Sequence, residues 1–291
     1  MEKDWTKEIP EGAFISSPTY KVGEYFNLYK TDEAAGMKYY FFDPTEHGFE
    51  KGKSYPVFVF LHGYTNALEG DVCINYAGAE FFSTEKYQKS FGGAYILVPL
   101  ANEKRNSEGK VVDSWSEEYV GPLYDLINQF IKKHADKNGG AGKKLLWGNS
   151  AGGRMVYLMG EKYPSFFNIL IPIGADELPA DSVIDKWDEN NVHLFLAMGK
   201  RDEFNDYNGS IVPRLPRLEK MKHSFIFTPD WVYNGDKGIA SINFGTEMGQ
   251  HCLVNPMACN LLFDDGTYMD ERLPNGLTEW IFKAVKGEKC Q

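Results

Sequence analysis

The chain has 291 residues, 43% of them hydrophobic and 15% aromatic, which is enough apolar material for a substantial buried core. Its formal net charge of −10 argues against nucleic acid as a partner, because phosphate binding needs a concentrated basic surface. Its unbroken apolar runs fall short of the roughly 18 residues that a membrane-spanning helix needs, so a membrane is not expected as a partner either.

The first 50 residues are predicted to form a lead-in and two antiparallel strands. The strands are expected at residues 25–29 and 37–42, with a turn within residues 31–36. The N-terminus is charged and has no apolar core of the kind that signal peptides carry. We therefore expect a cytoplasmic protein, or a secreted one from which a signal peptide has been removed.

Short apolar runs alternate with helical patterns along the rest of the chain. Each run is nearly all apolar, as in strands that are buried on both faces of a sheet. The predicted strands are residues 57–61, 94–98, 144–147, 169–173, 193–197 and 224–228. The predicted helices are residues 115–134, 154–163, 213–222 and 277–285. This alternation predicts a mostly parallel sheet with helices on both faces. Because the sequence shows no linker and no repeat, residues 1–291 are expected to form a single domain.

Three long loops are predicted at the carboxyl ends of strands, where open α/β sheets bind ligands. They are residues 64–93, 101–114 and 229–250. Residues 175–191 are too few to form a separate cap domain. We therefore expect an open, shallow site at this edge of the sheet.

A nucleophile is predicted at Ser150, the centre of the G-x-S-x-G pentapeptide at residues 148–152. The pentapeptide lies between a predicted strand and a predicted helix. In that context it is typical of a nucleophile elbow, a sharp turn that holds a serine Oγ at the carboxyl edge of a sheet. The flanking residues must be small because the strand and the helix pack closely around the turn.

A serine hydroxyl needs a base to take its proton and a third group to orient that base. In the α/β-hydrolase topology the acid and then the histidine follow the serine along the chain. His251, in a glycine-containing loop beyond the last predicted strand, is the predicted base, and His223 is the alternative. Asp202, in the turn after the predicted strand 193–197, is the predicted acid. The alternative acids are Glu203, Asp206 and Asp176.

Two backbone amides are expected to bind the oxyanion that forms during acyl transfer. Ala151 directly follows the serine and starts its helix, so it is one predicted donor. The second is expected after Gly63, with Tyr64 as the predicted donor and Thr65 as the alternative. His62 precedes the nucleophile in the chain, and we interpret it as a structural residue that hydrogen-bonds loop backbone.

The four cysteines show neither a C-x-x-C pair nor zinc-like spacing with histidine. They are expected to be free and mostly buried, with a Cys252–Cys259 disulfide as an alternative for an exported protein. No metal or organic cofactor is expected. Arg154, one turn after the serine, is expected to pair with a neighbouring acid on the helix surface, with a substrate carboxylate as the alternative.

These residues resemble the α/β-hydrolases of the feruloyl-esterase, polyhydroxyalkanoate-depolymerase and predicted-peptidase type. The likeness runs from about residue 55 to residue 282 and includes Phe-Leu-His-Gly at 60–63, Gly-Asn-Ser-Ala-Gly-Gly at 148–153 and Gly-Gln-His at 249–251. It implies an α/β-hydrolase fold with about eight strands and no large cap domain. It also implies that Ser150, Asp202 and His251 are nucleophile, acid and base. Asn149 departs from the pattern, since many relatives carry histidine there.

The substrate is expected to meet aromatic side chains in the long loops. Trp115, Trp231, Tyr233 and Phe244 are candidates for a flat wall, and Thr65 is a further candidate substrate contact. We predict a serine carboxylesterase acting on small or carbohydrate-linked esters, with feruloyl or cinnamoyl esters as the best guess. The alternatives are a serine peptidase of the same fold and a non-catalytic α/β-hydrolase that binds a ligand.

Overall fold

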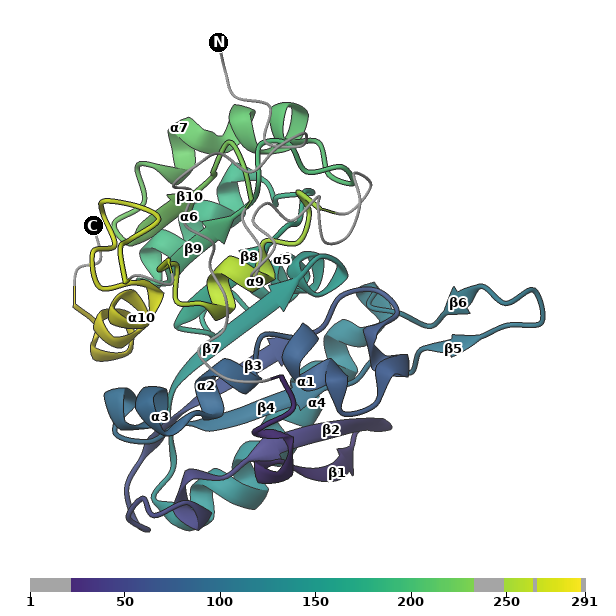
Figure 1. The fold of residues 1–291 in the computed structure, drawn as a ribbon, viewed down its shortest axis with the longest axis vertical. Helices are drawn as coiled ribbons and strands as arrows, with labels where there is room; N and C mark the ends of the chain where they lie inside the picture. The colour runs from purple at the N-terminus through teal and green to yellow at the C-terminus, as the bar shows by residue number, and fades with distance from the viewer. Residues whose placement is uncertain (1–21, 233–248, 264–265, 289–291) are drawn as a thin grey trace.

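The computed structural model describes residues 22–232, 249–263 and 266–288, and its centre is an eight-stranded sheet (Figure 1). The strands follow the order β1-β2-β4-β3-β7-β8-β9-β10. Strand β2 pairs antiparallel with β1 and β4, and every other pairing in this sheet is parallel. The strands are β1 (Lys30–Ala34), β2 (Met37–Phe42), β3 (Tyr55–Leu61), β4 (Tyr95–Pro99), β7 (Ala141–Asn149), β8 (Ile169–Ile173), β9 (His193–Ala197) and β10 (Ser224–Phe227).

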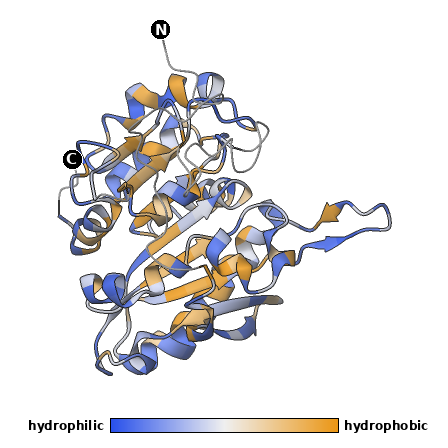
Figure 2. Cartoon of the chain, in the orientation of Figure 1, coloured by the Kyte–Doolittle hydropathy of each residue, from blue (hydrophilic) through white to orange (hydrophobic). Residues whose placement is uncertain are grey.

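The central strands are buried on both faces because apolar side chains point to each side of the sheet. Along β3, Phe58 and Phe60 join one hydrophobic cluster, while Val57, Val59 and Leu61 join the other. The first cluster is covered by α1 (Val72–Tyr76), α2 (Glu80–Ser83), α3 (Glu85–Phe91), α9 (Val254–Ala258) and α10 (Leu277–Lys286). The second is covered by α4 (Val120–Phe130), α5 (Ala151–Lys162), α6 (Asp181–Glu189) and α7 (Leu215–Leu218). Figure 2 shows the apolar residues concentrated in the strands between these two layers.

The first predicted strand is wrong. Residues 25–29 contain the 3₁₀ turn Phe26–Leu28, and the strand that pairs with β2 begins at Lys30. Strand β1 lies at the edge of the sheet and reads Lys-Thr-Asp-Glu-Ala, so it has no apolar pattern to reveal it. Its two-residue turn is Ala35 and Gly36, both with positive φ (50° and 74°), which suits the right-handed twist of a tight hairpin.

Two of the predicted long loops carry regular structure. Residues 64–93 contain the short helices α1, α2 and α3, whose lengths of 5, 4 and 7 residues give too few turns for a helical period to be read. Residues 101–114 contain a hairpin of β5 (Lys104–Arg105) and β6 (Val111–Val112), which projects from the body (Figure 1). Most of the third loop, residues 233–248, lies outside the described residues.

The longer predicted helices match α4, α5 and α10, whereas the segment 213–222 is helical only over its first half. Helices α6 and α9 were not predicted. Cys73, Cys252 and Cys259 are free thiols, so the alternative Cys252–Cys259 disulfide is not formed, and Cys290 lies outside the described residues. Among the helices of the described ranges, none combines the length and the hydrophobicity that crossing a bilayer requires.

Candidate active site

Ser150 lies on a strained turn between β7 and α5. Its φ of 54° and ψ of −116° fall outside the regions that L-residues ordinarily occupy. The Ser150 amide donates to the Ile173 carbonyl on neighbouring β8 at 2.8 Å, which ties the turn to the sheet. A Cβ at Gly148 would lie 2.1 Å from the Gly152 carbonyl oxygen, and one at Gly152 would lie 2.4 Å from that of Leu61. Only glycine fits at these two positions.

The side chains of Ser150, His251 and Asp202 form a continuous hydrogen-bonded chain. His251 Nε2 lies 2.9 Å from Ser150 Oγ, and His251 Nδ1 lies 2.8 Å from Asp202 Oδ2. The Asp202 side chain is fully buried and that of His251 is 11% exposed. The structure thus brings together three residues that are separated by up to 101 positions in the sequence.

The surroundings of Asp202 fix the orientation of the imidazole. Asp202 Oδ1 accepts the backbone N–H groups of Phe204 (2.8 Å) and Asn205 (2.9 Å), in the turn after β9. Its Oδ2 faces His251 Nδ1, so the neutral ring carries its proton on Nδ1. His251 Nε2 is then an acceptor that points at the Ser150 hydroxyl.

Two polar residues that support the site were not assigned this role from the sequence. The Glu203 carboxylate accepts hydrogen bonds from the backbone N–H groups of Gln250 (3.0 Å) and His251 (2.9 Å). These bonds anchor the loop that carries His251 to the turn after β9. The Asn205 amide donates to the Gly174 carbonyl (3.0 Å) and to Asp202 Oδ1 (3.2 Å). Their closeness to Asp202 in the sequence is the one signal that could have indicated them.

The alternative residues have other partners. His223 stacks on His193, with ring centroids 4.1 Å apart, at the amino end of β10 and therefore at the edge of the sheet opposite Ser150. The Asp176 carboxylate accepts a hydrogen bond from the Arg154 guanidinium at 2.9 Å. Arg154 therefore pairs with an acid, as expected, but that acid lies in the loop after β8 and not on the surface of its own helix. Asp206 accepts the backbone N–H of Gly209 at 2.9 Å.

The loop after β3 borders the serine. A Cβ placed on Gly63 would lie 3.6 Å from Ser150 Cβ, so this backbone passes directly beside Ser150. Ala151 is the first residue of α5, where a backbone N–H has no acceptor within its own helix. The Thr65 amide donates to Glu103 Oε1 at 3.0 Å, so it is already engaged. Tyr64 is 52% exposed, and its hydroxyl donates to the Val111 carbonyl at 2.9 Å.

His62 is a structural residue, as expected. Its ring is fully buried, Nδ1 donates to the Gly63 carbonyl at 2.7 Å, and Nε2 accepts the Ala101 amide at 3.1 Å. Burial lowers the pKa of His62, which favours the neutral ring that this pair of bonds requires. The histidine therefore links the loop after β3 to the loop after β4.

The aromatic candidates are placed differently from one another. The Trp115 indole N–H donates to the His62 carbonyl at 3.0 Å, so this ring supports the loop after β3. The Arg201 guanidinium lies over the Trp231 ring, with Cζ 4.2 Å from the ring centroid. Tyr233 and Phe244 lie outside the described residues. Phe204, which was not predicted, is 57% exposed with its ring centroid 5.1 Å from that of His251.

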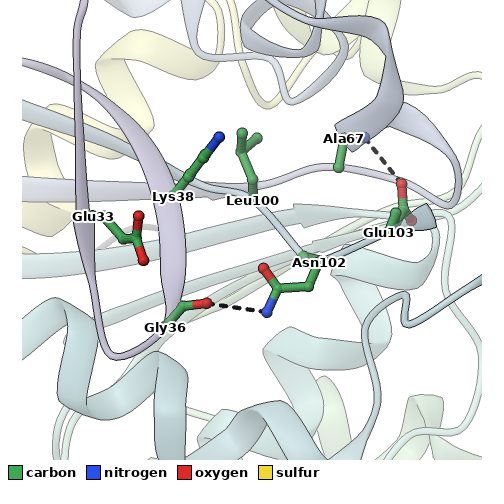
Figure 3. A pocket seen from close by; sticks show the side chains of 8 residues that line it. Glu33, Gly36, Lys38, Ala67, Leu100, Asn102 and Glu103 are labelled. Carbon is green, nitrogen blue, oxygen red and sulfur yellow. Dashed lines mark hydrogen bonds between the residues drawn. The ribbon is translucent and has the colours of Figure 1, made fainter.

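A cavity of about 370 Å³ lies at the carboxyl end of β4, between the β1–β2 hairpin and the loop after β3 (Figure 3). In the sheet β4 is separated from β7, the strand before Ser150, only by β3. The cavity is lined by Glu33, Gly36, Lys38, Ala67, Leu100, Ala101, Asn102 and Glu103. The lining therefore combines charged and amide groups with aliphatic surface.

Comparisons with known proteins identify the fold. No family model matches the sequence, and no curated protein matches it. A thermostable esterase matches with a TM-score of 0.60 and 17% sequence identity. The match covers 80% of this chain and 60% of the esterase chain. A feruloyl esterase module from Clostridium thermocellum, complexed with sinapinate, has 12% identity and a TM-score of 0.48, covering 85% of this chain and 95% of its own. The sheet and its likeness to the thermostable esterase show that the chain has the α/β-hydrolase fold.

Proposed function

We propose that the protein is a serine carboxylesterase in which Ser150 is the nucleophile, His251 the base and Asp202 the orienting acid. The observation that carries the proposal is the chain of two hydrogen bonds, 2.8 Å and 2.9 Å long, from Asp202 through His251 to Ser150. The strained turn at Ser150 supports it, because such strain is typical of positions where a reactive group must be exposed. The fold likeness to a thermostable esterase agrees with this reaction class.

The proposed reaction has two steps. His251 takes the Ser150 proton as Oγ attacks the ester carbonyl, and the amides of Ala151 and Tyr64 bind the oxyanion. Collapse of this intermediate breaks the bond to the alcohol, which leaves with the proton from His251. Water then attacks the acyl-enzyme by the same route and releases the carboxylic acid and free Ser150. The chemistry needs neither a metal nor an organic cofactor.

For the substrate we propose small or carbohydrate-linked esters, with feruloyl or cinnamoyl esters as the best candidates. The exposed Phe204 ring beside His251 offers an aromatic surface to a phenolic acyl group. The cavity supports a hydroxyl-rich alcohol, because Glu33, Lys38 and Asn102 supply both acceptors and donors around it. Trp231 and Tyr233 remain proposed substrate contacts.

A serine peptidase of the same fold is the second candidate, because the same three side chains also support amide hydrolysis. A non-catalytic binding protein is the third candidate. It has no need for three side chains aligned at hydrogen-bonding distance, which argues against it.

Labelling with a fluorophosphonate separates the enzymes from the binding protein. Ser150 Oγ is expected to form a bond to phosphorus with loss of fluoride, giving one adduct that mass spectrometry locates on Ser150. The Ser150→Ala variant is the control and should take up no label. A folded wild-type protein without an adduct would favour the binding protein.

A substrate series separates the esterase from the peptidase. We expect turnover of p-nitrophenyl acetate and methyl ferulate, with higher kcat/KM for a feruloylated sugar than for methyl ferulate. Glu33→Ala should remove the advantage of the sugar ester and leave methyl ferulate turnover unchanged. Cleavage of a peptide amide with negligible ester turnover would contradict the esterase proposal.

A further inference from the structure

The loop after β3 holds an unusual backbone conformation beside Ser150. Thr65 has a φ of 72°, in the left-handed region that a β-branched side chain normally avoids. Two residues before it lies Gly63, where an added Cβ would lie 3.6 Å from Ser150 Cβ. A conformation of this kind persists only where the surrounding structure holds it in place. The contacts of Thr65 therefore indicate what fixes this loop.

Glu103 holds the loop from the opposite side. Glu103 is 8% exposed as a residue, and its carboxylate accepts three hydrogen bonds. The backbone N–H groups of Thr65 and Ala67 each donate at 3.0 Å, to Oε1 and Oε2 respectively, and Ser114 Oγ donates to Oε1 at 2.6 Å. Figure 3 shows the bond to Ala67 at the wall of the cavity. One carboxylate thus clamps the backbone on both sides of Asn66.

The hydrogen bonds of this loop determine which amides remain for an oxyanion. Within residues 63–68, the Thr65 and Ala67 amides donate to Glu103, the Asn66 amide donates to the Gly63 carbonyl, and the Leu68 amide donates to the Thr65 carbonyl. The amides left are those of Gly63, which lies beside Ser150, and of the next residue, Tyr64. Since a displacement of about 1 Å in such a donor costs on the order of 100-fold in rate, the anchor of the loop matters for catalysis.

We propose that Glu103 is a positioning residue that holds the loop after β3 so that the Tyr64 amide faces the oxyanion, an inference that rests on the proposed esterase function. Glu103→Gln tests it, because the amide keeps the size of the side chain but replaces one acceptor oxygen with a donor. That NH₂ group must then face the N–H of Thr65 or of Ala67. The loop loses one bond and relaxes, while the Asp202–His251–Ser150 chain is left in place.

The expected result is a loss in kcat of about 10- to 100-fold for p-nitrophenyl acetate, with KM within about 2-fold of wild type. The affinity for a boronic acid that forms a tetrahedral adduct with Ser150 should fall in parallel. Glu108→Gln is the matched control, because it makes the same change in the same loop at an exposed carboxylate that pairs with Lys110. Its kinetics should equal those of wild type.

The outcomes for the two proposals are distinct. Wild-type kcat and boronate affinity in folded Glu103→Gln would overturn the positioning role and leave the esterase proposal intact. Absence of Ser150 labelling in the wild-type protein would instead overturn the esterase proposal. If Glu103→Gln does not fold, Glu103→Asp keeps the charge and both acceptors with a shorter reach, and the same split between kcat and KM is expected. Unchanged kcat in that variant would also overturn the positioning role.

Discussion

Asp202 is a fully buried carboxylate whose two oxygens have different partners. One oxygen accepts two backbone N–H groups in its own turn, and the other accepts from His251. A buried carboxylate is tolerated because these hydrogen bonds replace those it would make to water. The same arrangement sets the imidazole tautomer, so the backbone of one short turn controls the acceptor that faces Ser150.

Asp202→Asn should leave the fold intact and remove most of the activity. The amide fits the same space, but if its NH₂ group faces Nδ1 the ring proton is favoured on Nε2, where it can no longer accept from Ser150. We expect kcat to fall about 10⁴-fold with little change in KM. Steady-state ester hydrolysis measures the loss, and thermal melting shows whether the fold is kept. Activity within tenfold of wild type would rule out this role for Asp202.

The two histidines that follow the serine in the chain offer a direct test of the base. His251→Ala should lower kcat by about 10⁴- to 10⁶-fold, because no other group lies at hydrogen-bonding distance of Ser150 Oγ among the described residues. His223→Ala, at the opposite edge of the sheet, should keep wild-type kcat per folded molecule. The reverse result would move the base to His223. Both rates are expressed per mole of folded protein, with the folded fraction measured by circular dichroism.

At the scale of elements, the β7–α5 turn depends on close contact between backbones. The G-x-S-x-G pattern indicates this turn because the backbone itself demands glycine, and such a demand is visible in a few consecutive letters. The three short helices between β3 and β4 are different. Their formation depends on packing Ile74, Phe82 and Tyr87 against the sheet, and no local pattern of that length reveals it.

Gly152→Ala should destabilise the protein by about 3 kcal/mol, because its Cβ would lie 2.4 Å from the Leu61 carbonyl oxygen and β3 would have to move. Gly109→Ala is the control. Gly109 lies in the β5–β6 hairpin with a φ of +76°, and a Cβ added there would have no atom within 4 Å. This substitution should therefore destabilise the protein by about 1 kcal/mol, the cost of the backbone conformation alone. Urea unfolding measures both. Equal losses would show that the close approach at Gly152 relaxes easily.

At the scale of the whole molecule, three buried or half-buried histidines make stability depend on pH. Burial is the largest cause that lowers the pKa of His62, His134 and His193. The folded state therefore favours their neutral forms, while the unfolded chain binds protons below about pH 6.5. Their contribution to stability is fully present above that pH and is lost as pH falls from about 6.5 toward the folded pKa values. Burial raises the pKa of Glu80, so this residue has the opposite effect. Its contribution to stability is fully present below about pH 4.5 and is lost as pH rises toward the folded pKa.

We expect the urea midpoint to be lower at pH 5.5 than at pH 7.5. His134→Phe should narrow that difference, because it removes one titrating ring and fits between Phe41 and Phe130, whose ring centroids lie 4.5 Å and 4.9 Å from that of His134. At pH 7.5 the variant should be about as stable as wild type. The same pH difference in both proteins would show that His134 does not contribute to it.

The sequence by itself determined the buried parallel strands, the turn at Ser150 and the chain order of the candidate acid and histidine. These features are local, because a continuous apolar run or a run of required glycines is present in a few neighbouring residues. Only the tertiary structure decided the position of the edge strand β1. It alone also decided three contacts: Trp115 with the His62 carbonyl, Glu203 with the backbone of His251, and Glu103 with the backbone of Thr65. Those contacts join residues 38 to 53 positions apart, and they depend on strand order and loop conformation, which no short pattern of residues encodes.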